Sequence, residues 1–377
     1  MASRKRSRIL MVGPSPPGVG GLATNMRLLT GSSLARRFDL RVFPTTKRRR
    51  HVFPNRPHWD SIPYLLYHTV ALGWTILRRR PDLVYVKATS DTGFLRDTVL
   101  MTVARVLGRP VLCHLHGRPM GRLFRRDPPG FVRWGMARAA VTVVLSPGLA
   151  RQFEAMFPGR RLEVVPNVVE VGRFRPGERP PGGGLRILTV GRLSREKGTW
   201  DLLEVAALLR GRGVEAEFRL VGIGETAAEE RALRARAAAA GLDDTVVFLG
   251  SRRGEDLVRE YAGADVFFLP THAEIFPNVV LEALAAGLPV VTTNVPVIPE
   301  MFGPVEGILH DPGDTEGMAG SLERLSRDAA LRASMGAAAR GLAETRYHVE
   351  AAADRLATLF EEMLNGRGRR AGSSTGS

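Results

Sequence analysis

Two apolar runs separated by a polar segment most restrict what this chain can fold into. The runs Val266–Leu269 and Leu288–Val291 are typical of buried parallel strands. The segment between them is predicted to turn helical at about Pro277, because proline suits the first turn of a helix, and to end at Gly287. A strand, a polar loop, a helix and a second strand in this order predict an α/β fold.

Two glutamates flank the predicted start of this helix. Glu274 lies on the loop that leaves the first strand, and Glu282 lies about one turn inside the helix. The backbone N–H groups of Asn278 and Val279 lack partners within the helix, so with the positive end of the helix dipole they form a site suited to phosphate. This arrangement predicts a nucleotide-sugar site, with Glu274 at the sugar, the N–H groups at the diphosphate and Glu282 at the ribose hydroxyls.

The segment EIFPNVVLEALAAGLPVV resembles the EGFPNVxLEAMAxGxPVV signature of the retaining glycosyltransferases of family four. The resemblance implies two Rossmann-like domains that face each other across a cleft (the GT-B fold), with a C-terminal helix that crosses back to the first domain. It also places Ile275, Phe276 and Pro277 with the donor-binding residues. Ile275 stands where the family usually has glycine, which bears on sugar selectivity more than on the type of reaction.

The chain has the length of two domains, at 377 residues. A segment dense in proline and glycine, VPNVVEVGRFRPGERPPGGG, predicts the boundary, and its start resembles the PNGVDxxxFxP segment that closes the first domain in the family. We predict an N-terminal acceptor-side domain over 1–170, a linker over 171–184, a C-terminal nucleotide-sugar-binding domain over 185–346, a crossover helix on the first domain over 347–365 and a disordered tail over 366–377.

The first domain opens with a strand, a glycine-rich loop and a helix. Arg8–Gly13 is a short apolar strand, and the loop PSPPGVGG leads into a helix predicted over Leu22–Arg36. The resemblance places Gly20 and Gly21, at the end of this loop, near the donor phosphates. The alternative is a tight turn that binds no ligand.

A second candidate in this domain is a histidine at the end of a strand. The strand Pro110–His116 directs its carboxyl end toward the crevice where ligands bind in open α/β sheets. His114 shares that side of the strand but lies deeper, so we expect it to be structural. The resemblance implies that His116 contacts the transferred sugar near its reacting carbon. The following loop is interpreted as a mobile acceptor-side segment with four arginines, Arg118, Arg122, Arg125 and Arg126.

The second domain begins with another strand, loop and helix. The strand Leu185–Val190 leads into GRLSREKG, where Arg192 and Lys197 bracket the turn before the helix. Two cations near a helix N-terminus can hold a diphosphate without a metal. The element resembles the family's GRLxxxKG, in which these side chains contact the leaving phosphates. Gly222 and Gly224, in a later loop, permit close approach of the backbone to a ligand.

The predicted chemistry divides these residues into two groups. Breaking the anomeric bond of a nucleotide sugar develops negative charge on the leaving diphosphate and positive charge on the sugar ring. Arg192, Lys197 and the N–H groups near Asn278 are placed for the diphosphate, and Glu274 and His116 for the ring. We therefore predict His116, Glu274, Arg192 and Lys197 as the catalytic residues. Retention at the anomeric carbon is implied by the resemblance alone.

No metal site and no cofactor are expected. A metal-dependent transferase of the other main fold would need an acidic DxD, whereas Asp243 and Asp244 are adjacent and precede a strand. A single cysteine, Cys113, excludes an internal disulfide and fits a reducing cytoplasm. The sequence also predicts no signal peptide and no membrane span. The nucleoside-diphosphate sugar is expected as a substrate.

The formal charge of +16 points to anionic partners. Nucleic acid is not expected, because no helix-turn-helix, zinc finger or aromatic RNP-like strand is evident. A genome biased toward arginine accounts for part of the charge equally well. The aromatic-rich helix predicted over Ser61–Arg80 ends in three arginines. It either rests on anionic lipid headgroups or covers the sheet, and both interpretations stay open.

The residues and the resemblance together predict a retaining, metal-independent hexosyltransferase. It would move a sugar from a nucleoside-diphosphate sugar to a glycan or lipid-linked acceptor in cell-surface polysaccharide synthesis, in the cytoplasm or on the inner face of the cell membrane. Three alternatives are a nucleotide-sugar epimerase, a non-catalytic nucleotide-sugar-binding protein, and a nucleic-acid binder that rests only on charge.

Overall fold

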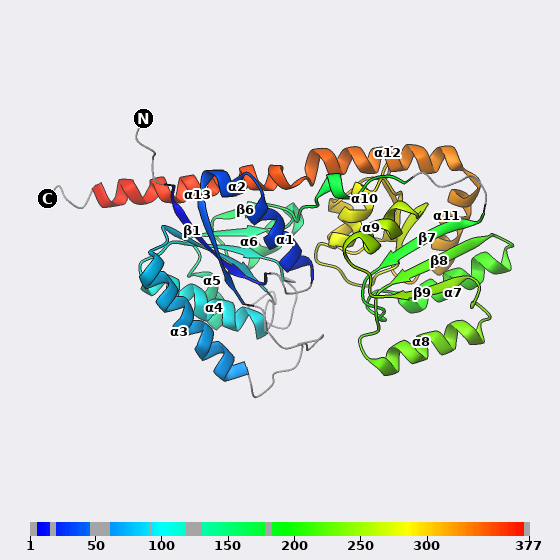
Figure 1. Cartoon of the computed structure of the whole chain (residues 1–377), viewed down its shortest axis with the longest axis horizontal. Coiled ribbons are helices and arrows are strands. Elements are labelled where there is room, and N and C mark those ends of the chain that lie inside the picture. Colours follow the sequence, from blue (N-terminus) through cyan, green and yellow to red (C-terminus); the bar gives the residue numbers. More distant parts are fainter. Residues whose placement is uncertain are drawn as a thin grey trace. The chain divides into compact units, whose positions relative to one another are not determined.

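The chain forms two compact units, which Figure 1 shows in the colours of the sequence. The computed structural model describes residues 6–15, 20–45, 61–89, 92–117, 130–177 and 183–372. The first unit combines Met1–Val168 with Val349–Ser377, and the second unit is Val169–His348. Each unit contains a six-stranded sheet in which every neighbouring pair of strands is parallel.

The sheet of the first unit has the order β2-β1-β3-β4-β5-β6. Its chain runs from β1 to one neighbour, β2, and then returns to place β3 on the other side of β1. This reversal is a topological switch point, where ligands bind in open α/β sheets. The strands are β1 Arg8–Gly13, β2 Asp39–Pro44, β3 Leu83–Ala88, β4 Val111–Leu115, β5 Val141–Val144 and β6 Leu162–Val164.

The sheet of the second unit has the order β12-β11-β10-β7-β8-β9. The chain runs from β7 through β8 to β9 at one edge and then returns to place β10 on the other side of β7. A second switch point therefore lies between β7 and β10. The strands are β7 Leu185–Val190, β8 Ala216–Val221, β9 Val246–Gly250, β10 Val266–Leu269, β11 Val290–Thr293 and β12 Gly307–His310.

Helices connect the strands in both units. Those of the first unit are α1 Gly21–Gly31, α2 Leu34–Arg37, α3 Ser61–Arg79, α4 Thr92–Val106, α5 Gly130–Met136, α6 Pro147–Met156 and α13 Val349–Gly372. Those of the second unit are α7 Thr199–Gly211, α8 Ala227–Ala239, α9 Gly254–Ala262, α10 Asn278–Ala285, α11 Thr315–Arg327 and α12 Ala329–Arg346, with 3₁₀ turns η1 Val171–Arg173 and η2 Ile298–Glu300.

The helix expected over Leu22–Arg36 is two helices, α1 and α2. The chain leaves the first at Ser32, whose hydroxyl donates to the carbonyl of Leu29 at 2.7 Å and whose backbone is extended. The same hydroxyl oxygen accepts from the N–H of Leu34 at 3.3 Å, in the first turn of α2. Serine side chains compete in this way with the backbone bonds of a helix interior. The prediction of one helix was wrong for that reason.

The division between the units falls at Val168 rather than inside the expected linker 171–184. Phe174 is buried in the second unit and packs edge-on against Tyr261, with ring centroids 5.3 Å apart. The first part of the expected linker therefore belongs to the packed second unit. Residues 178–182, within the glycine-rich part, lie outside the described residues.

The last helix, α13, differs from expectation at both ends. Tyr347 is not part of it: its hydroxyl donates to the carbonyl of Met301 at 2.7 Å within the second unit. The helix begins at Val349 and continues to Gly372, so residues 366–372 are helical instead of disordered. Residues 373–377 lie outside the described part. Phe360 of α13 is buried in the core of the first unit.

Candidate active site

The switch point of the second unit brings two predicted loops to the same edge of the sheet. The loop after β7 carries Arg192 and Lys197, and the loop after β10 carries Glu274. Because β7 and β10 are adjacent and parallel, their carboxyl ends meet at this edge. The position agrees with the general rule for ligand sites in open α/β sheets.

Lys197 and Glu274 form an ion pair at this edge. The ammonium nitrogen of Lys197 lies 2.6 Å from Oε1 of Glu274 and donates to the carbonyl of Ala273 at 3.2 Å. Their side chains are only 17% and 11% exposed, respectively. At this depth water screens the two charges poorly, so each has a strong influence on a ligand that enters. The structure thus joins two of the four predicted catalytic residues.

Gly198 explains how the two loops approach so closely. Its φ is +69°, in the left-handed region, and a Cβ atom built on it would overlap the carbonyl oxygen of Pro270. The loops are also linked by the N–H of His272, which donates to the carbonyl of Glu196 at 2.8 Å. A glycine after Lys197 is therefore required by packing, and it sets the distance from Lys197 to Glu274.

Arg192 is paired with a different carboxylate. Its guanidinium lies 3.5 Å from Oε1 of Glu225, in the loop after β8, and the arginine side chain is half-buried. The structure therefore holds Arg192 and Lys197 by separate acidic partners on neighbouring loops. A phosphate that binds here would compete with both ion pairs.

Gly222 and Gly224 were expected to let the backbone approach a ligand. In the structure, contacts within the protein explain why each of these two positions is a glycine. A Cβ at Gly222, whose φ is +153°, would overlap the carbonyl oxygen of Gly191, so this glycine allows the loops after β7 and β8 to touch. The N–H of Gly224 donates to Oε2 of Glu230 at 3.0 Å, and a Cβ there would lie 2.7 Å from that of Glu230.

The N-terminus of α10 lies at the end of the same loop as Glu274. Pro277 is the N-cap with extended backbone, rather than a residue of the first turn, and α10 begins at Asn278. The first N–H groups of a helix have no partner inside it, and these are the groups of Asn278 and Val279. Among the residues that the structure describes, none is a hydrogen-bond partner of the buried side-chain Oδ1 of Asn278. A buried acceptor of this kind calls for a donor from a ligand or water.

Phe276 and Ile275 have different surroundings in the loop. The ring of Phe276 is buried and lies edge-on to Tyr347, with centroids 6.1 Å apart. It therefore anchors the loop in the interior of the unit. Ile275, at the position where the family usually has glycine, is partly buried.

Glu282 faces a tyrosine of the preceding helix. The hydroxyl of Tyr261, in α9, lies 2.9 Å from Oε2 of Glu282 and 3.2 Å from the carbonyl of Val279. Burial raises the pKa of Glu282 to about 7, although the Tyr261 hydroxyl and the charge of Arg173 act in the opposite direction. Sequence reasoning missed Tyr261, which has no motif and is recognisable only as an aromatic residue on a polar helix. The two predicted glutamates therefore contact different side chains: Glu274 contacts Lys197, and Glu282 contacts Tyr261.

We expect this carboxyl to make stability depend on pH. Its folded pKa of about 7 lies above the ordinary value of 4.5, so between these pH values the folded state holds a proton that the unfolded state has released. Stability therefore falls as the pH rises through this window. Glu282→Gln should remove that loss, so its melting temperature relative to wild type should be higher at pH 8 than at pH 4.5. Glu154→Gln, at an exposed carboxylate of α6, is the control. Equal pH dependence of wild type and Glu282→Gln would contradict the role of burial.

In the first unit, Gly20 and Gly21 lie at the start of α1, after the loop that follows β1. Gly20 is the N-cap with φ of +121°, and both glycines are exposed. A Cβ on Gly20 would meet nothing within 4 Å. The glycine is thus favoured by its backbone conformation, and not by a contact with another described residue.

His116 directly follows β4, where it was expected. The residue is 9% exposed, its ring lies beside Asn167, and its buried Nε2 has no hydrogen-bond partner among the residues that the structure describes. Burial lowers the pKa of His116 well below its ordinary value, and the neighbouring Lys87 and His114 add to the effect. The ring is therefore neutral.

His114 is a structural residue, as predicted. Its Nε2 lies 3.1 Å from the carbonyl of Val165 and its Nδ1 lies 2.7 Å from the hydroxyl of Tyr85. A carbonyl only accepts, so Nε2 carries the proton and Nδ1 accepts from the tyrosine. Burial lowers the pKa of His114 well below its ordinary value. Both of its nitrogens are in use within the core.

Lys87 is a buried cation that sequence reasoning missed. It lies near the end of β3, is fully buried, and donates to Oδ1 of Asn25 in α1. A Cβ on Gly13 would lie 2.9 Å from Cβ of Lys87, so the glycine that ends β1 leaves room for this side chain. Burial lowers the pKa of Lys87 well below its ordinary value. Its signal in the sequence is a lysine near the end of the otherwise apolar run LVYVKA.

Two other expectations concern loops and metals. The loop 118–129, with the four arginines named above, lies outside the described residues. Within the part of the chain that the structure describes, no group of three or more histidine, cysteine or acidic residues is arranged to hold a metal ion.

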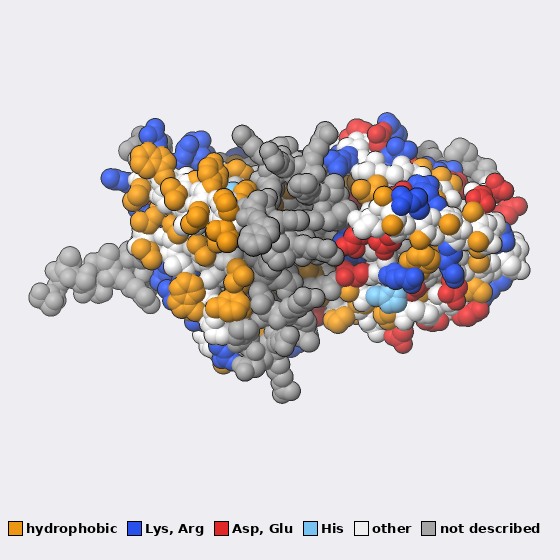
Figure 2. Space-filling model, turned by 90° about the horizontal axis from the view of Figure 1, so that it is seen from below, with side chains coloured by type: hydrophobic (Ala, Val, Ile, Leu, Met, Phe, Trp, Pro, Cys, Tyr) orange, Lys and Arg blue, Asp and Glu red, His pale blue; other side chains and the backbone are white. Residues whose placement is uncertain are grey.

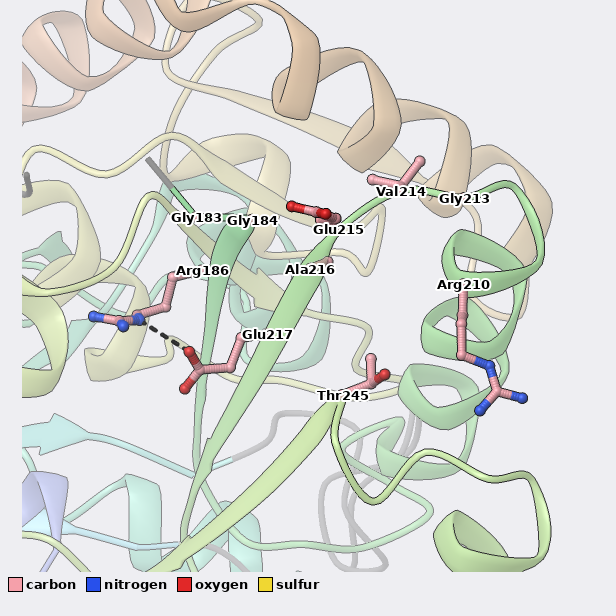
Figure 3. A pocket seen from close by; sticks show the side chains of 10 residues that line it. All are labelled: Gly183, Gly184, Arg186, Arg210, Gly213, Val214, Glu215, Ala216, Glu217 and Thr245. Atoms are coloured by element: carbon pink, nitrogen blue, oxygen red, sulfur yellow. Dashed lines mark hydrogen bonds and ion pairs between the residues drawn. The ribbon is translucent and has the colours of Figure 1, made fainter. Parts of the chain in front are cut away.

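A hollow of about 580 Å³ lies at the opposite edge of the second sheet (Figure 3). Arg186 and Glu217 form an ion pair of 3.3 Å on its wall, near the starts of β7 and β8. Ligands of open α/β sheets bind at the carboxyl ends of the strands, whereas this hollow is at the amino ends. We therefore take the loops with Lys197 and Glu274, and not this hollow, as the candidate active site.

Two family models together match most of the chain. The model of the family described as Glycosyltransferase Family 4 matches residues 19–173. The model described as Glycosyl transferases group 1 matches residues 172–342. The chain belongs to the group 1 glycosyltransferases. The family predicted from the EIFPNVVLEALAAG and GRLSREKG motifs is thus confirmed.

Individual relatives of this group 1 glycosyltransferase have modest sequence identity to it. The amylovoran biosynthesis glycosyltransferase AmsK of Erwinia amylovora is 33% identical over 186 residues, which cover 48% of this chain and 45% of that protein. The chain matches about half the length of the first curated relatives.

Solved structures establish the fold. Sucrose-phosphate synthase from Thermosynechococcus elongatus has a TM-score of 0.78 at 19% identity, over 96% of this chain and 100% of that chain. Anabaena HepE, solved in complex with UDP-glucose, has a TM-score of 0.72 at 19% identity, over 94% of this chain and 99% of that chain. The two Rossmann-like domains predicted for the group 1 glycosyltransferase are confirmed.

Proposed function

We propose that this protein transfers a hexose from a nucleoside-diphosphate sugar to an acceptor with retention at the anomeric carbon. The observation that carries the proposal is the Lys197–Glu274 ion pair, which lies at a topological switch point on the loop that leads to the N-terminus of α10. A mostly buried cation, a mostly buried carboxylate and free helix N–H groups are the set that a diphosphate and a sugar would engage together.

The donor phosphates would replace Glu274 and Glu225 as partners of Lys197 and Arg192. Negative charge that develops on the leaving diphosphate is then stabilised by both cations and by the N–H groups of Asn278 and Val279. Release of Lys197 frees the Glu274 carboxylate to face the sugar. Glu282 has a carboxyl oxygen for the ribose hydroxyls, and the buried Oδ1 of Asn278 accepts from a donor hydroxyl.

The remaining parts of the proposal concern partners and place. We propose a glycan or lipid-linked acceptor of cell-surface polysaccharide synthesis, since the name of AmsK describes amylovoran biosynthesis. We propose a nucleotide-sugar donor, since HepE was solved with UDP-glucose. His116 would contact the transferred sugar, with its neutral ring as a hydrogen-bond partner. We also propose that the reaction needs no metal ion and that the protein acts at the inner face of the cell membrane.

Calorimetric titration with UDP-, GDP- and ADP-sugars tests the donor, because a ligand of the folded state also raises its melting temperature. We expect one nucleotide class to bind, with unchanged affinity in EDTA. Loss of binding in EDTA would overturn metal independence. Binding followed by release of an epimerised nucleotide sugar without acceptor would identify an epimerase, and binding without any turnover would identify a non-catalytic protein. Absence of binding by all classes would contradict the site.

A further inference from the structure

The helix α3 exposes a broad apolar face. Six large apolar side chains on it are between 59% and 71% exposed: Ile62, Leu66, Tyr67, Val70, Trp74 and Leu77. The opposite side of the helix is apolar as well, since Leu72 and Ile76 are buried in the unit. Figure 2 shows apolar side chains gathered on this side of the first unit. A helix that is apolar all round is normally covered on both sides, and an exposed patch of this kind marks a contact surface.

Positive charge accompanies this face. Between residues 61 and 140, the acidic residues that the structure describes are Asp82 and Asp97. Asp82 accepts from the N–H of Arg8 at 2.7 Å, and Asp97 is buried and paired with Arg96 at 2.7 Å. The described arginines in the same stretch are Arg78, Arg79, Arg80, Arg96, Arg105, Arg109, Arg133 and Arg138. The described residues of this stretch therefore carry a clear excess of positive charge.

Arg78, Arg79 and Arg80 extend this charge directly from the apolar face. They lie at the carboxyl-terminal end of α3 and are all exposed. An apolar helix face that continues into exposed cations is the pattern of helices that lie in the membrane interface. Tyr67 and Trp74 fit the same setting, since aromatic rings with a polar group are favoured at the headgroup level.

We propose that the outer face of α3 docks on an anionic lipid surface, with the helix lying parallel to the membrane plane. In the described part of the chain, no helix is long and apolar enough to cross a membrane. A second copy of this chain is the less favoured occupant, because it would bring another surface of the same positive sign against these arginines. The inference does not depend on the proposed reaction, but it rests on the membrane location proposed above and names the surface that would make the contact.

Co-flotation of the full chain with vesicles tests the apolar contribution. We expect binding to vesicles of phosphatidylglycerol and phosphatidylcholine, and at least about tenfold weaker binding of Trp74→Asp. The matched control is Val305→Asp in the second unit, because Val305 and Trp74 are similarly exposed, at 58% and 65%. Equal binding of Trp74→Asp and wild type would overturn the proposal, as would an absence of binding to anionic vesicles at low salt.

The charge contribution has its own pair of variants. Arg78→Ala/Arg79→Ala should weaken binding by about fivefold for each arginine, which corresponds to ~1 kcal/mol per cation at an anionic surface. The control is Arg252→Ala/Arg253→Ala, an adjacent exposed pair in the second unit. Binding of the wild type should also decrease as salt rises. Equal losses in the two double variants would show only a general effect of net charge and would overturn the assignment to α3.

Tryptophan fluorescence distinguishes insertion from adsorption or self-association. Lipids brominated on the acyl chain should quench the wild type and should quench Trp74→Phe less, because Trp74 enters the interface. All variants must have wild-type melting temperatures to be compared. Self-association without vesicles that Trp74→Asp abolishes, together with unaltered quenching in Trp74→Phe, would identify a second copy as the occupant and overturn the lipid proposal.

Discussion

Replacing Lys197 with methionine is expected to lower kcat by about a hundredfold or more, the usual effect of removing one group that stabilises charge in the transition state. The ammonium of Lys197 is mostly buried and lies 2.6 Å from Glu274, so no solvent cation can take its place. The variant also leaves the Glu274 carboxylate without its partner beside the donor phosphates. Initial rates of sugar transfer at saturating donor would measure the loss.

A control for this prediction exists in the same loop. Arg195 is exposed, and its guanidinium lies 4.3 Å from the ring centroid of Trp200. Arg195→Met removes one positive charge two residues away and should keep kcat within about twofold, since exposed charges act weakly. The pair Lys197→Met and Glu274→Gln should be non-additive, because the two side chains are in direct contact. Wild-type turnover in Lys197→Met would refute the assigned site.

Gly198→Ala is expected to destabilise the second unit by about 3 kcal/mol or more, from strain in the left-handed region together with an overlap of atoms. The new Cβ would displace the carbonyl of Pro270 and separate the two loops. The distance between Lys197 and Glu274 would increase as a result, so turnover should fall along with stability. Thermal unfolding and initial rates at a temperature where the variant is folded would separate these two effects.

Gly213 offers a matched control for the backbone contribution. Its φ is also +69°, but a Cβ there would meet nothing within 4 Å. Gly213→Ala should therefore cost only the conformational strain, about 1–2 kcal/mol, and should leave turnover unchanged. Equal loss of stability in the two alanine variants would show that the contact with Pro270 contributes nothing.

Several strands were predicted at their observed residues. Arg8–Gly13, Leu185–Val190 and Val266–Leu269 are observed as expected, whereas the strand expected over Leu288–Val291 is observed two residues later, over Val290–Thr293. These strands are predictable because a strand in a parallel sheet needs a short apolar run with a definite end. Helix ends depend on individual side-chain contacts. The break at Ser32 and the position of Tyr347 outside α13 each depend on such contacts, which the periodicity of the sequence does not reveal.

The sequence predicted individual residues of the candidate site, but it did not predict which side chains contact each other. Lys197 and Glu274 are 77 positions apart, and their contact depends on the order of β7 and β10 in the sheet. Glu282 was expected at a ligand, and its contact with Tyr261 arises from the packing of α9 on α10. Lys87 was missed because a single lysine in an apolar strand has no motif. Its burial becomes visible only in the folded unit.

The return of α13 to the first unit affects how the protein is made. Phe360 of this helix lies edge-on to Phe38 and Tyr85, with centroids 5.5 and 6.0 Å away, inside the core of the first unit. A ribosome synthesises the strands of that core first but supplies α13 only after residues 169–348 have been added. The second unit therefore has all of its residues earlier than the first. A chain interrupted before Val349 would lose part of the N-terminal core, while the C-terminal sheet would be complete.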